Sequence, residues 1–542
     1  MNSKITVKAK RQCDVFVIGA GIAGIMAAIS AAEKGANVII ASSSKMFSGS
    51  SFYPGTWGLG LIGPVDKSDE DDLINTIKTV GCEVIDYELV KTFVSKINPT
   101  LEKIKEMGIK LKQPNNSKEK EFIPCFDHKE RNWNGILFDS AKEVFSKKID
   151  ELKITRYEFS EVIEIVKDKS SIEGVILIKE GKEIEYIRCK AIVIASGGIG
   201  GLFKQRLNTD DVNGLGQSLA LKIGCQLVNI EFMQMMPGYI NPCPKTIFNE
   251  KTFKYVEILD YDGKNILEDI DNYEEKLKIR STHGPFTSRL VSKDIDYAIF
   301  KEGIKEPTGV RVVYKDSIKK NQPEFIRVYF EWLKEKKHLT VDDEINIGIF
   351  FHAANGGIKI NKCAETDISG VFAAGEVTGG MHGADRIGGL STANGLVFGK
   401  IAGESASKYA QRFNCLDGDE IELSINQVEN AEELLIDLQN LMFKYAMIEK
   451  SEEGIVEAIN LLEDIKSRKF ISNNIDIKTL YKTYRLNANL LLAEGILRVL
   501  YLRKESRGSH YRKDYPRIDE KMSKKILVRY RGNLKLILNR RY

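Results

Sequence analysis

The first forty residues alternate between apolar runs and glycine-rich turns. Residues 14–18 form an apolar run of strand length, residues 19–24 read Gly-Ala-Gly-Ile-Ala-Gly, and a largely apolar segment then extends to Lys34. A second apolar run of strand length ends at Ala41. This order of strand, glycine turn, helix and strand predicts a βαβ unit at the start of the chain.

The rest of the chain divides into segments of different pattern. Residues 66–150 are mainly helical in periodicity, and residues 155–194 concentrate β-branched side chains in short runs that end in a glycine turn. Residues 233–348 are rich in proline and aromatic residues, which indicates an inserted domain. Leucine-rich residues 426–500 predict helices, and the alternation in residues 525–538 predicts a terminal hairpin.

Composition and charge narrow the class of protein. The chain has 542 residues, 43% hydrophobic and 29% charged, which is a globular balance spread over more than one domain. A net charge of +4 excludes a strongly basic nucleic-acid coat, and no nucleic-acid-binding motif is present. From Arg503 onward there are 14 basic and 4 acidic residues, which we interpret as a solvated basic face or a docking surface for an acidic partner.

The spacing of the cysteines bears on metal binding, and the N-terminal apolar run bears on whether the chain is anchored in a membrane. The eight cysteines lie far apart without a C-x-x-C pair, so we expect reduced cysteines and no metal site. Residues 15–32 are apolar except for Ser30 and could imitate a membrane anchor, but Asp14 and the three glycines favour the βαβ interpretation. We therefore predict a cytoplasmic protein without a transmembrane segment.

The three glycines of the first turn have separate physical roles. In a G-x-G-x-x-G turn, one glycine permits the tight turn, one lets the backbone approach a pyrophosphate and one allows close packing of helix on strand. Gly19, Gly21 and Gly24 match this spacing. The N-terminus of the following helix would face the phosphates with free N–H groups. The motif predicts dinucleotide binding.

Four further motifs point to a narrower family. They are Ala-Ser-Gly-Gly at 195–198, Gly-Glu at 375–376, His-Gly-Ala-Asp-Arg-Ile-Gly-Gly at 382–389, and Lys-Glu-Ser-Arg-Gly-Ser-His-Tyr-Arg-Lys-Asp-Tyr-Pro at 504–516. Together they resemble the flavoprotein family of succinate dehydrogenase, fumarate reductase and L-aspartate oxidase. The resemblance covers nearly the whole chain and is weakest in residues 100–150 and 240–280.

This resemblance implies an α/β fold with a Rossmann-like FAD-binding domain, an inserted α+β capping domain and a C-terminal helical domain that ends in the hairpin. The domains implied are a first FAD-binding part (1–232), a capping and substrate domain (233–348), a second FAD-binding part (349–415) and the C-terminal domain (416–542).

The resemblance also implies FAD as the cofactor. Residues 42–45 lack the acid that many dinucleotide folds place there, but this family often has Ser-Lys at that point. Residues 46–60 contain no histidine that could link the flavin, so we predict non-covalent FAD. The implied cofactor residues are Gly19, Ala20, Gly21, Ala23, Gly24, Ser42, Ser44, Lys45, Ala195, Gly197, Gly198, Glu376 and Ser391.

Three residues match the family's substrate motifs. Arg289 falls at the place of the catalytic arginine, His352 at a substrate-binding histidine and Arg386 at the arginine that binds a substrate carboxylate. Guanidinium groups bind carboxylates bidentately, and fixed positive charge stabilises the carbanion-like character that develops during hydride transfer.

Other family positions are changed. Where family members carry His and Thr for a second carboxylate, this chain has Met236 and Gly238, and Leu390 replaces an asparagine. A T-G-D-G turn reads Asn-Gly-Leu-Gly from Asn213. The family's proton-relay glutamate should fall near residues 250–258, but the segment that ends at Glu257 matches it poorly. These changes indicate a less polar substrate end.

Three functions follow as hypotheses. The first is hydride transfer between flavin N5 and an activated C=C or C–C bond of a carboxylate-bearing, fumarate- or succinate-like substrate. The second is an amino-acid oxidase like L-aspartate oxidase. The third is a flavin-carrying subunit that passes electrons to an iron–sulfur or other electron-transfer protein.

Overall fold

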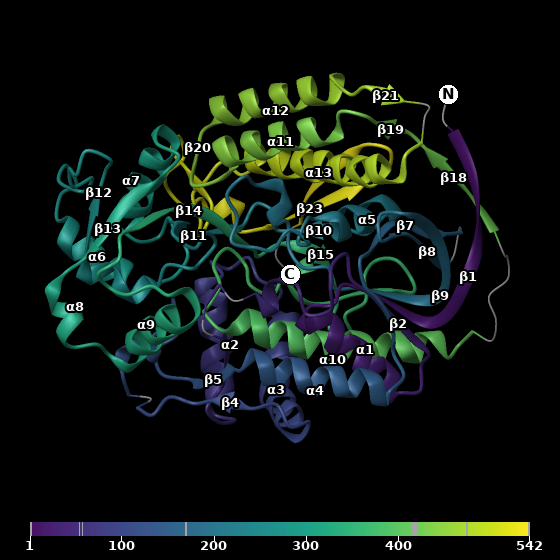
Figure 1. The fold of residues 1–542 in the computed structure, drawn as a ribbon, viewed down its shortest axis with the longest axis horizontal. Coiled ribbons are helices and arrows are strands. Elements are labelled where there is room, and N and C mark those ends of the chain that lie inside the picture. The colour runs from purple at the N-terminus through teal and green to yellow at the C-terminus, as the bar shows by residue number, and fades with distance from the viewer. Residues whose placement is uncertain are drawn as a thin grey trace.

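The computed structural model describes residues 3–53, 55–56, 58–116, 118–168, 171–413, 420–472 and 475–539. Its body is an eight-stranded sheet in which six strands follow the order β6-β2-β1-β9-β8-β7, with β16 beside β9 and β18 beside β1 (Figure 1). The strands are β1 (Ser3–Ile18), β2 (Val38–Ala41), β6 (Thr155–Tyr157), β7 (Ser160–Lys167), β8 (Ile172–Lys179), β9 (Glu183–Ile194), β16 (Val371–Ala373) and β18 (Glu420–Ile425).

The predicted βαβ unit is present at the centre of this sheet. β1 leads through the glycine turn into α1 (Ile22–Glu33) and returns to β2, which pairs with β1 in parallel. The first strand is longer than predicted, because Ser3 to Lys8 pair antiparallel with β18. Helices cover the sheet on both sides (Figure 1): α1, α2 (Asp69–Val80), α3 (Tyr87–Glu106), α4 (Phe138–Glu151) and α10 (Leu390–Ala410) along the lower side, and α5 (Leu215–Ile223) above.

A second sheet carries the inserted segment. It has the order β11-β14-β13-β12 and lies with helices at the left of Figure 1. Its elements are β11 (Met233–Asn241), β12 (Val256–Leu259), β13 (Val310–Tyr314), β14 (Ile345–Ala354), α6 (Tyr273–Arg280), α7 (Lys293–Lys305), α8 (Asp316–Lys320) and α9 (Glu324–Lys337). β14 runs as one strand across the predicted boundary at 348, and the boundary at 415 lies outside the described residues, as does Cys415. The domain division stays a prediction.

The C-terminal part consists of three helices and the predicted hairpin. α11 (Ala431–Ala446), α12 (Glu452–Ser467) and α13 (Ile477–Leu502) run along the upper side of Figure 1. The hairpin turns at Gly532, and its strands β23 (Lys525–Tyr530) and β24 (Leu534–Asn539) join a sheet with β10 (Leu227–Val228), β15 (Gly357–Lys359) and β17 (Thr378–Gly379). A fourth sheet has the order β3 (Leu59–Gly63), β5 (Asn132–Ile136) and β4 (Leu111–Lys112). The expected fold class is confirmed.

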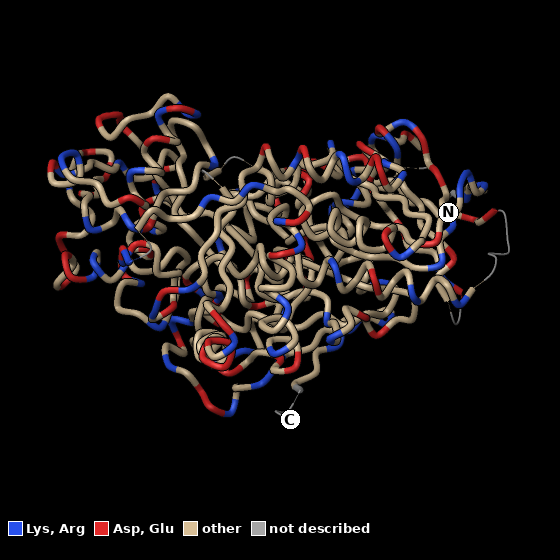
Figure 2. Tube along the Cα trace, turned by 90° about the horizontal axis from the view of Figure 1, so that it is seen from below, with Lys and Arg blue, Asp and Glu red and all other residues tan. Residues whose placement is uncertain are grey.

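Part of the basic C-terminal sequence is buried rather than solvated. The Arg503 guanidinium donates to Glu231 Oε1 at 2.6 Å and to Glu505 Oε1 at 2.7 Å, and Arg507 Nε donates to the same Glu505 oxygen at 2.7 Å. All four side chains are at most 2% exposed. This buried ion network joins Arg503, directly after α13, to Glu231, two residues before β11 begins. On the outside, Figure 2 shows basic and acidic positions interspersed along the chain.

Candidate flavin and substrate site

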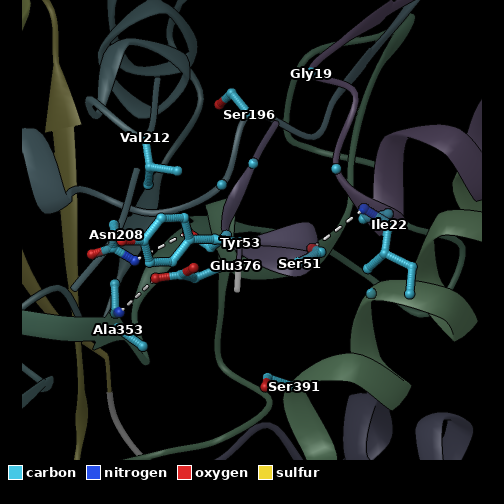
Figure 3. Close-up of a pocket in the computed structure, with 18 of the residues that line it drawn as sticks. Gly19, Ile22, Ser51, Tyr53, Ser196, Asn208, Val212, Ala353, Glu376 and Ser391 are labelled. Atoms are coloured by element: carbon cyan, nitrogen blue, oxygen red, sulfur yellow. Dashed lines mark hydrogen bonds between the residues drawn. The ribbon is translucent and has the colours of Figure 1, made fainter. Parts of the chain in front are cut away.

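The principal cavity lies where the glycine turn of the body meets the inserted sheet. Its volume is about 410 Å³, within the range of small-molecule sites. Its walls come from the turn after β1, residues 49–60, the turn after β9, the end of β14 and residues 374–395. Figure 3 shows Tyr53, Asn208 and Glu376 on one side of this space, with Ile22 and Ser51 across from them.

Close backbone packing requires the glycines of the first turn. Gly19 has φ +106°, and a Cβ there would lie 2.4 Å from the carbonyl oxygen of Ala195. A Cβ on Gly24 would lie 1.9 Å from the carbonyl oxygen of Gly19. α1 begins after Gly21 without a side-chain cap, Ile22 N donates to Ser51 Oγ at 3.4 Å, and residues 21–23 at this helix start line the cavity. Such a helix start suits a pyrophosphate.

Orphaned polar atoms on the cavity wall are consistent with a large polar ligand. Buried polar atoms are normally hydrogen-bonded. Four that belong to cavity-lining residues have no protein partner within the described chain: Ser196 Oγ, Asn208 Oδ1, His382 Nδ1 and Asn394 Oδ1. The glycine cradle and these atoms together fit FAD.

The structure brings most of the predicted cofactor residues to this cavity. The lining residues among them are Gly19, Ala20, Gly21, Ala23, Ser42, Ala195, Gly197, Glu376 and Ser391. Gly24, Ser44, Lys45 and Gly198 lie behind the wall. Ser42 Oγ accepts from Ser44 N at 3.3 Å and donates to the Lys45 carbonyl at 3.2 Å, so these two residues shape the turn that presents Ser42. Their individual roles stay predictions.

Glu376 is a half-buried carboxyl group that lines the cavity. Its Oε1 accepts from Ala354 N at 3.0 Å. Burial raises the pKa of Glu376, and the Ala354 N–H and Arg386 oppose that shift. The side chain fits only because position 198 is glycine: a Cβ there would lie 2.1 Å from Glu376 Oε1.

Arg386 and His352, two of the three predicted substrate residues, line the cavity together. Arg386 Nε and Nη2 donate to Gln234 Oε1 at 3.0 and 2.7 Å, and Nη1 has no partner among the described residues. Burial, reinforced by Arg386, lowers the pKa of His352 to about 3, so its imidazole is neutral. The site therefore combines a guanidinium with a neutral hydrogen-bonding ring.

Arg289 lies outside the residues that line the cavity. Its Nε donates to Asp385 Oδ2 at 2.8 Å, and its guanidinium lies 5.4 Å from the ring centre of Phe126. Burial raises the pKa of Asp385 to about 6, although Arg289 and Thr287 favour the carboxylate. The residue that captures Arg289 is 96 positions away in sequence, so motif spacing could not foresee the ion pair. The catalytic role of Arg289 stays a prediction.

Two cavity residues were missed by sequence reasoning. Glu250 lines the cavity, whereas Glu257 is exposed on β12. Cys125 also lines the cavity, from the segment where the family resemblance is weakest, and its Sγ lies 3.1 Å from Glu250 Oε1. Glu250 falls within residues 250–258, where the family resemblance places a proton-relay glutamate, whereas nothing in the sequence indicated Cys125. Met236, expected at the substrate end, does line the cavity.

A mixed sheet with a parallel centre and a glycine cradle, an inserted second sheet and an arginine-bearing cavity are the features of an FAD-binding protein of the oxidoreductase class. Family models agree: one described as FAD binding domain matches residues 14–253 and 295–392, and one described as fumarate reductase flavoprotein C-term matches residues 436–539. The chain belongs to the FAD-dependent oxidoreductase family of the fumarate reductase flavoproteins and L-aspartate oxidases.

Individual relatives span nearly the whole chain. The L-aspartate oxidase of Acinetobacter baylyi is 26% identical over 549 residues, 95% of this chain and 96% of its own. A fumarate reductase flavoprotein subunit of Proteus vulgaris is 28% identical over 544 residues, 92% and 89%. A solved quinol-fumarate reductase has the same fold, with a TM-score of 0.79 at 22% identity and 98% of each chain covered. FAD as the cofactor is thereby confirmed.

No helix among the described residues is both long enough and apolar enough to cross a bilayer.

Gly198→Ala should weaken FAD binding by about 10-fold or more, because forcing an extra methyl against a packed wall costs about 1–3 kcal/mol. The methyl group would displace Glu376 from Ala354 N. Titration of apoprotein with FAD, followed by flavin fluorescence, measures the change. Gly303→Ala is the matched control, because nothing lies within 4 Å of a Cβ at Gly303. Equal FAD affinity in both variants would contradict the conclusion that the site requires glycine at position 198.

Acid precipitation of the holoprotein should leave all the flavin in the supernatant. Residues 46–60 contain no histidine, and Ser51, which accepts from Ile22 N at 3.4 Å, is part of the wall in this segment. Absorbance near the flavin maximum, measured in the supernatant and in the pellet, shows which fraction carries the flavin. Yellow protein in the pellet would show a covalent link.

Proposed function

We propose that this enzyme transfers hydride between flavin N5 and an activated C=C or C–C bond of a carboxylate-bearing, fumarate- or succinate-like substrate. The observation that carries the proposal is Arg386, a half-buried guanidinium in the same cavity as the flavin cradle. When bound, FAD supplies the two-electron chemistry.

The chain's own residues orient the substrate in this proposal. Arg386 has Nη1 unpaired within the described protein while Gln234 holds its other edge, so the guanidinium is fixed before a carboxylate arrives. His352, with its pKa lowered by burial, offers a neutral ring nitrogen to the same substrate. In a role in proton delivery, Arg289 would act through its Nη atoms, because Nε donates to Asp385.

Reoxidation of the reduced flavin tests this function. Holoprotein is reduced anaerobically, and its flavin absorbance is followed after addition of fumarate and of enoates with a single carboxylate. We expect at least one enoate to restore the oxidised spectrum within seconds and to yield the saturated acid. Persistence of the reduced spectrum with every enoate would overturn the proposal.

An L-aspartate oxidase activity is the second candidate. It is supported by the full-length similarity to the Acinetobacter baylyi enzyme. Aerobic holoprotein with L-aspartate should then form hydrogen peroxide and reduce its flavin when oxygen is removed. Unchanged flavin absorbance with L-aspartate under anaerobic conditions would exclude this candidate.

A role as the flavin subunit of a larger complex is the third candidate. It is supported by the Proteus vulgaris relative, which is itself named as a subunit, and by the exposed part of the basic C-terminal sequence. Purification of the tagged chain from its own cells under anaerobic conditions should then yield an iron–sulfur or other redox protein in stoichiometric amount. Isolation of the chain alone with full turnover would contradict this role.

A further inference from the structure

One part of the cavity wall is acidic and sulfur-rich. It is formed by Cys125, Met236, Glu250 and Gly284, which we call the acidic wall. A Cβ placed on Gly284 would lie 3.3 Å from Met236 Cε, 3.6 Å from Cys125 Sγ and 3.8 Å from Glu250 Cδ. Four segments far apart in sequence therefore converge on one spot.

One carboxylate oxygen of Glu250 accepts a hydrogen bond from the described protein, and the other does not. The Cys125 thiol donates to Oε1 at 3.1 Å. Burial, followed by the nearby Glu250 carboxylate, raises the pKa of Cys125 to about 12, so the thiol keeps its proton as a donor. Oε2 has no hydrogen-bond partner among the described residues. A ligand in the cavity would meet an acceptor there.

The acidic wall adjoins the loop that carries Arg386. Gly388 N donates to the Cys125 carbonyl at 3.2 Å, which ties the two segments together. Gln234, which holds Arg386, and Met236 of the wall belong to the same strand, β11. A small substrate bound to Arg386 would therefore have its other end close to Glu250.

Positive charge is scarce around this cavity. Within the described chain, Arg386 is the one lysine or arginine that lines it. Burial lowers the pKa values of His352 and His382, so neither ring supplies a second charge. The neighbouring Lys251 lies behind the wall, where its Nζ donates to the Ile123 carbonyl at 3.4 Å. A second substrate carboxylate would face Glu250 without a cation.

We propose that the substrate carries one carboxylate, bound by Arg386, and an N–H donor at its other end, an amide or an amine, accepted by Glu250. This inference rests on the proposed function, of which it names the substrate class. The donor replaces the second carboxylate of a fumarate-like molecule. Glu250 and Cys125 thus act as specificity residues that select for a donor and against an anion.

A pair of nearly isosteric substrates tests the inference. Fumarate and its monoamide have almost the same shape and differ in charge at one end. We expect the monoamide to reoxidise reduced holoenzyme with a kcat/KM about 10-fold or more above that of fumarate, because like charges across a site are strongly disfavoured. An equal or higher kcat/KM with fumarate would overturn the inference.

Binding to the oxidised enzyme separates this inference from the proposed function. Succinate and its monoamide are titrated into oxidised holoprotein, and the flavin absorbance reports Kd without turnover. Tighter binding of the monoamide supports the role of the acidic wall in accepting an N–H donor, even if no enoate reoxidises the flavin. Tighter or equal binding of succinate, or no spectral response to either ligand, overturns the inference.

Substitution of Glu250 adds a test that loss of turnover cannot imitate. Glu250→Gln presents N–H donors of its own, so the ratio of the two Kd values should shift toward succinate by about 10-fold or more. Glu257→Gln, the same change at an exposed position of β12, should leave the ratio unaltered. A Glu250→Gln variant that loses turnover but keeps the wild-type Kd ratio would contradict the role assigned to Glu250.

Discussion

Arg386→Ala should lower kcat/KM by about 10²–10³-fold, because loss of one partner of a buried charged hydrogen bond costs about 2–5 kcal/mol. The substitution also leaves Gln234 Oε1 without the guanidinium that now donates to it twice. We expect FAD content to stay near wild type, since the glycine cradle is formed by other segments. Steady-state kinetics with the best substrate from the reoxidation assay measure the effect.

The control for this variant is an arginine in a different environment. Arg327→Ala removes an exposed side chain on α9 that pairs with Glu331 at 3.0 Å, and it should leave kcat/KM within about 2-fold because surface ion pairs contribute little. Arg386→Lys keeps the charge but not the planar fork, so it should recover only part of the loss. Wild-type kcat/KM in Arg386→Ala would remove this residue from substrate binding.

Glu505→Ala should lower the free energy of unfolding by about 3–5 kcal/mol, because it leaves two buried guanidinium groups without their shared carboxylate. Arg503 and Arg507 both donate to Glu505, and Asp519 N donates to it at 2.9 Å. Urea unfolding followed by circular dichroism and by flavin fluorescence reports the shift and tells whether the C-terminal helices detach first.

Glu453→Ala provides the comparison for the stability measurement. Glu453 is exposed on α12, so its removal should shift the urea midpoint only slightly. An equal midpoint in Glu505→Ala and wild type would mean that the buried network does not hold the C-terminal part to the body. Loss of flavin before loss of helix signal would place the first opening near the cavity.

Local patterns predicted the elements well and the pairings less well. The βαβ unit, α2, α3 and the hairpin at Gly532 follow from side-chain periodicity and turn residues within short windows. The extension of β1 was missed because Ser3 to Lys8 become strand by pairing with β18, more than 400 residues later. The strand β14 crosses the boundary predicted at 348 for a similar reason: its length is set by its pairing with β11.

The residues of the candidate site also fall into two groups: those that a motif or the family resemblance indicated, and those that only contacts in the folded chain reveal. Gly19, Gly21 and Gly24 were named from a motif whose spacing follows from backbone geometry around a dinucleotide, whereas Glu376 was named from the family resemblance. Arg386 and His352 were named from the family resemblance, and the structure brings both to the cavity. Cys125 carried no signal, because its importance arises from contact with Glu250, 125 positions away.

By itself the sequence determined the dinucleotide-binding unit and the family, and it places Met236 and Gly238 where the family resemblance implies His and Thr. These features depend on residue type within short, ordered segments. Only the tertiary structure decided that Asp385 captures Arg289, that Arg503 and Arg507 are buried, and that Cys125 and Glu250 meet on the cavity wall. The physical reason is that hydrogen bonds and ion pairs depend on distances between atoms, and packing of the inserted sheet on the body sets those distances.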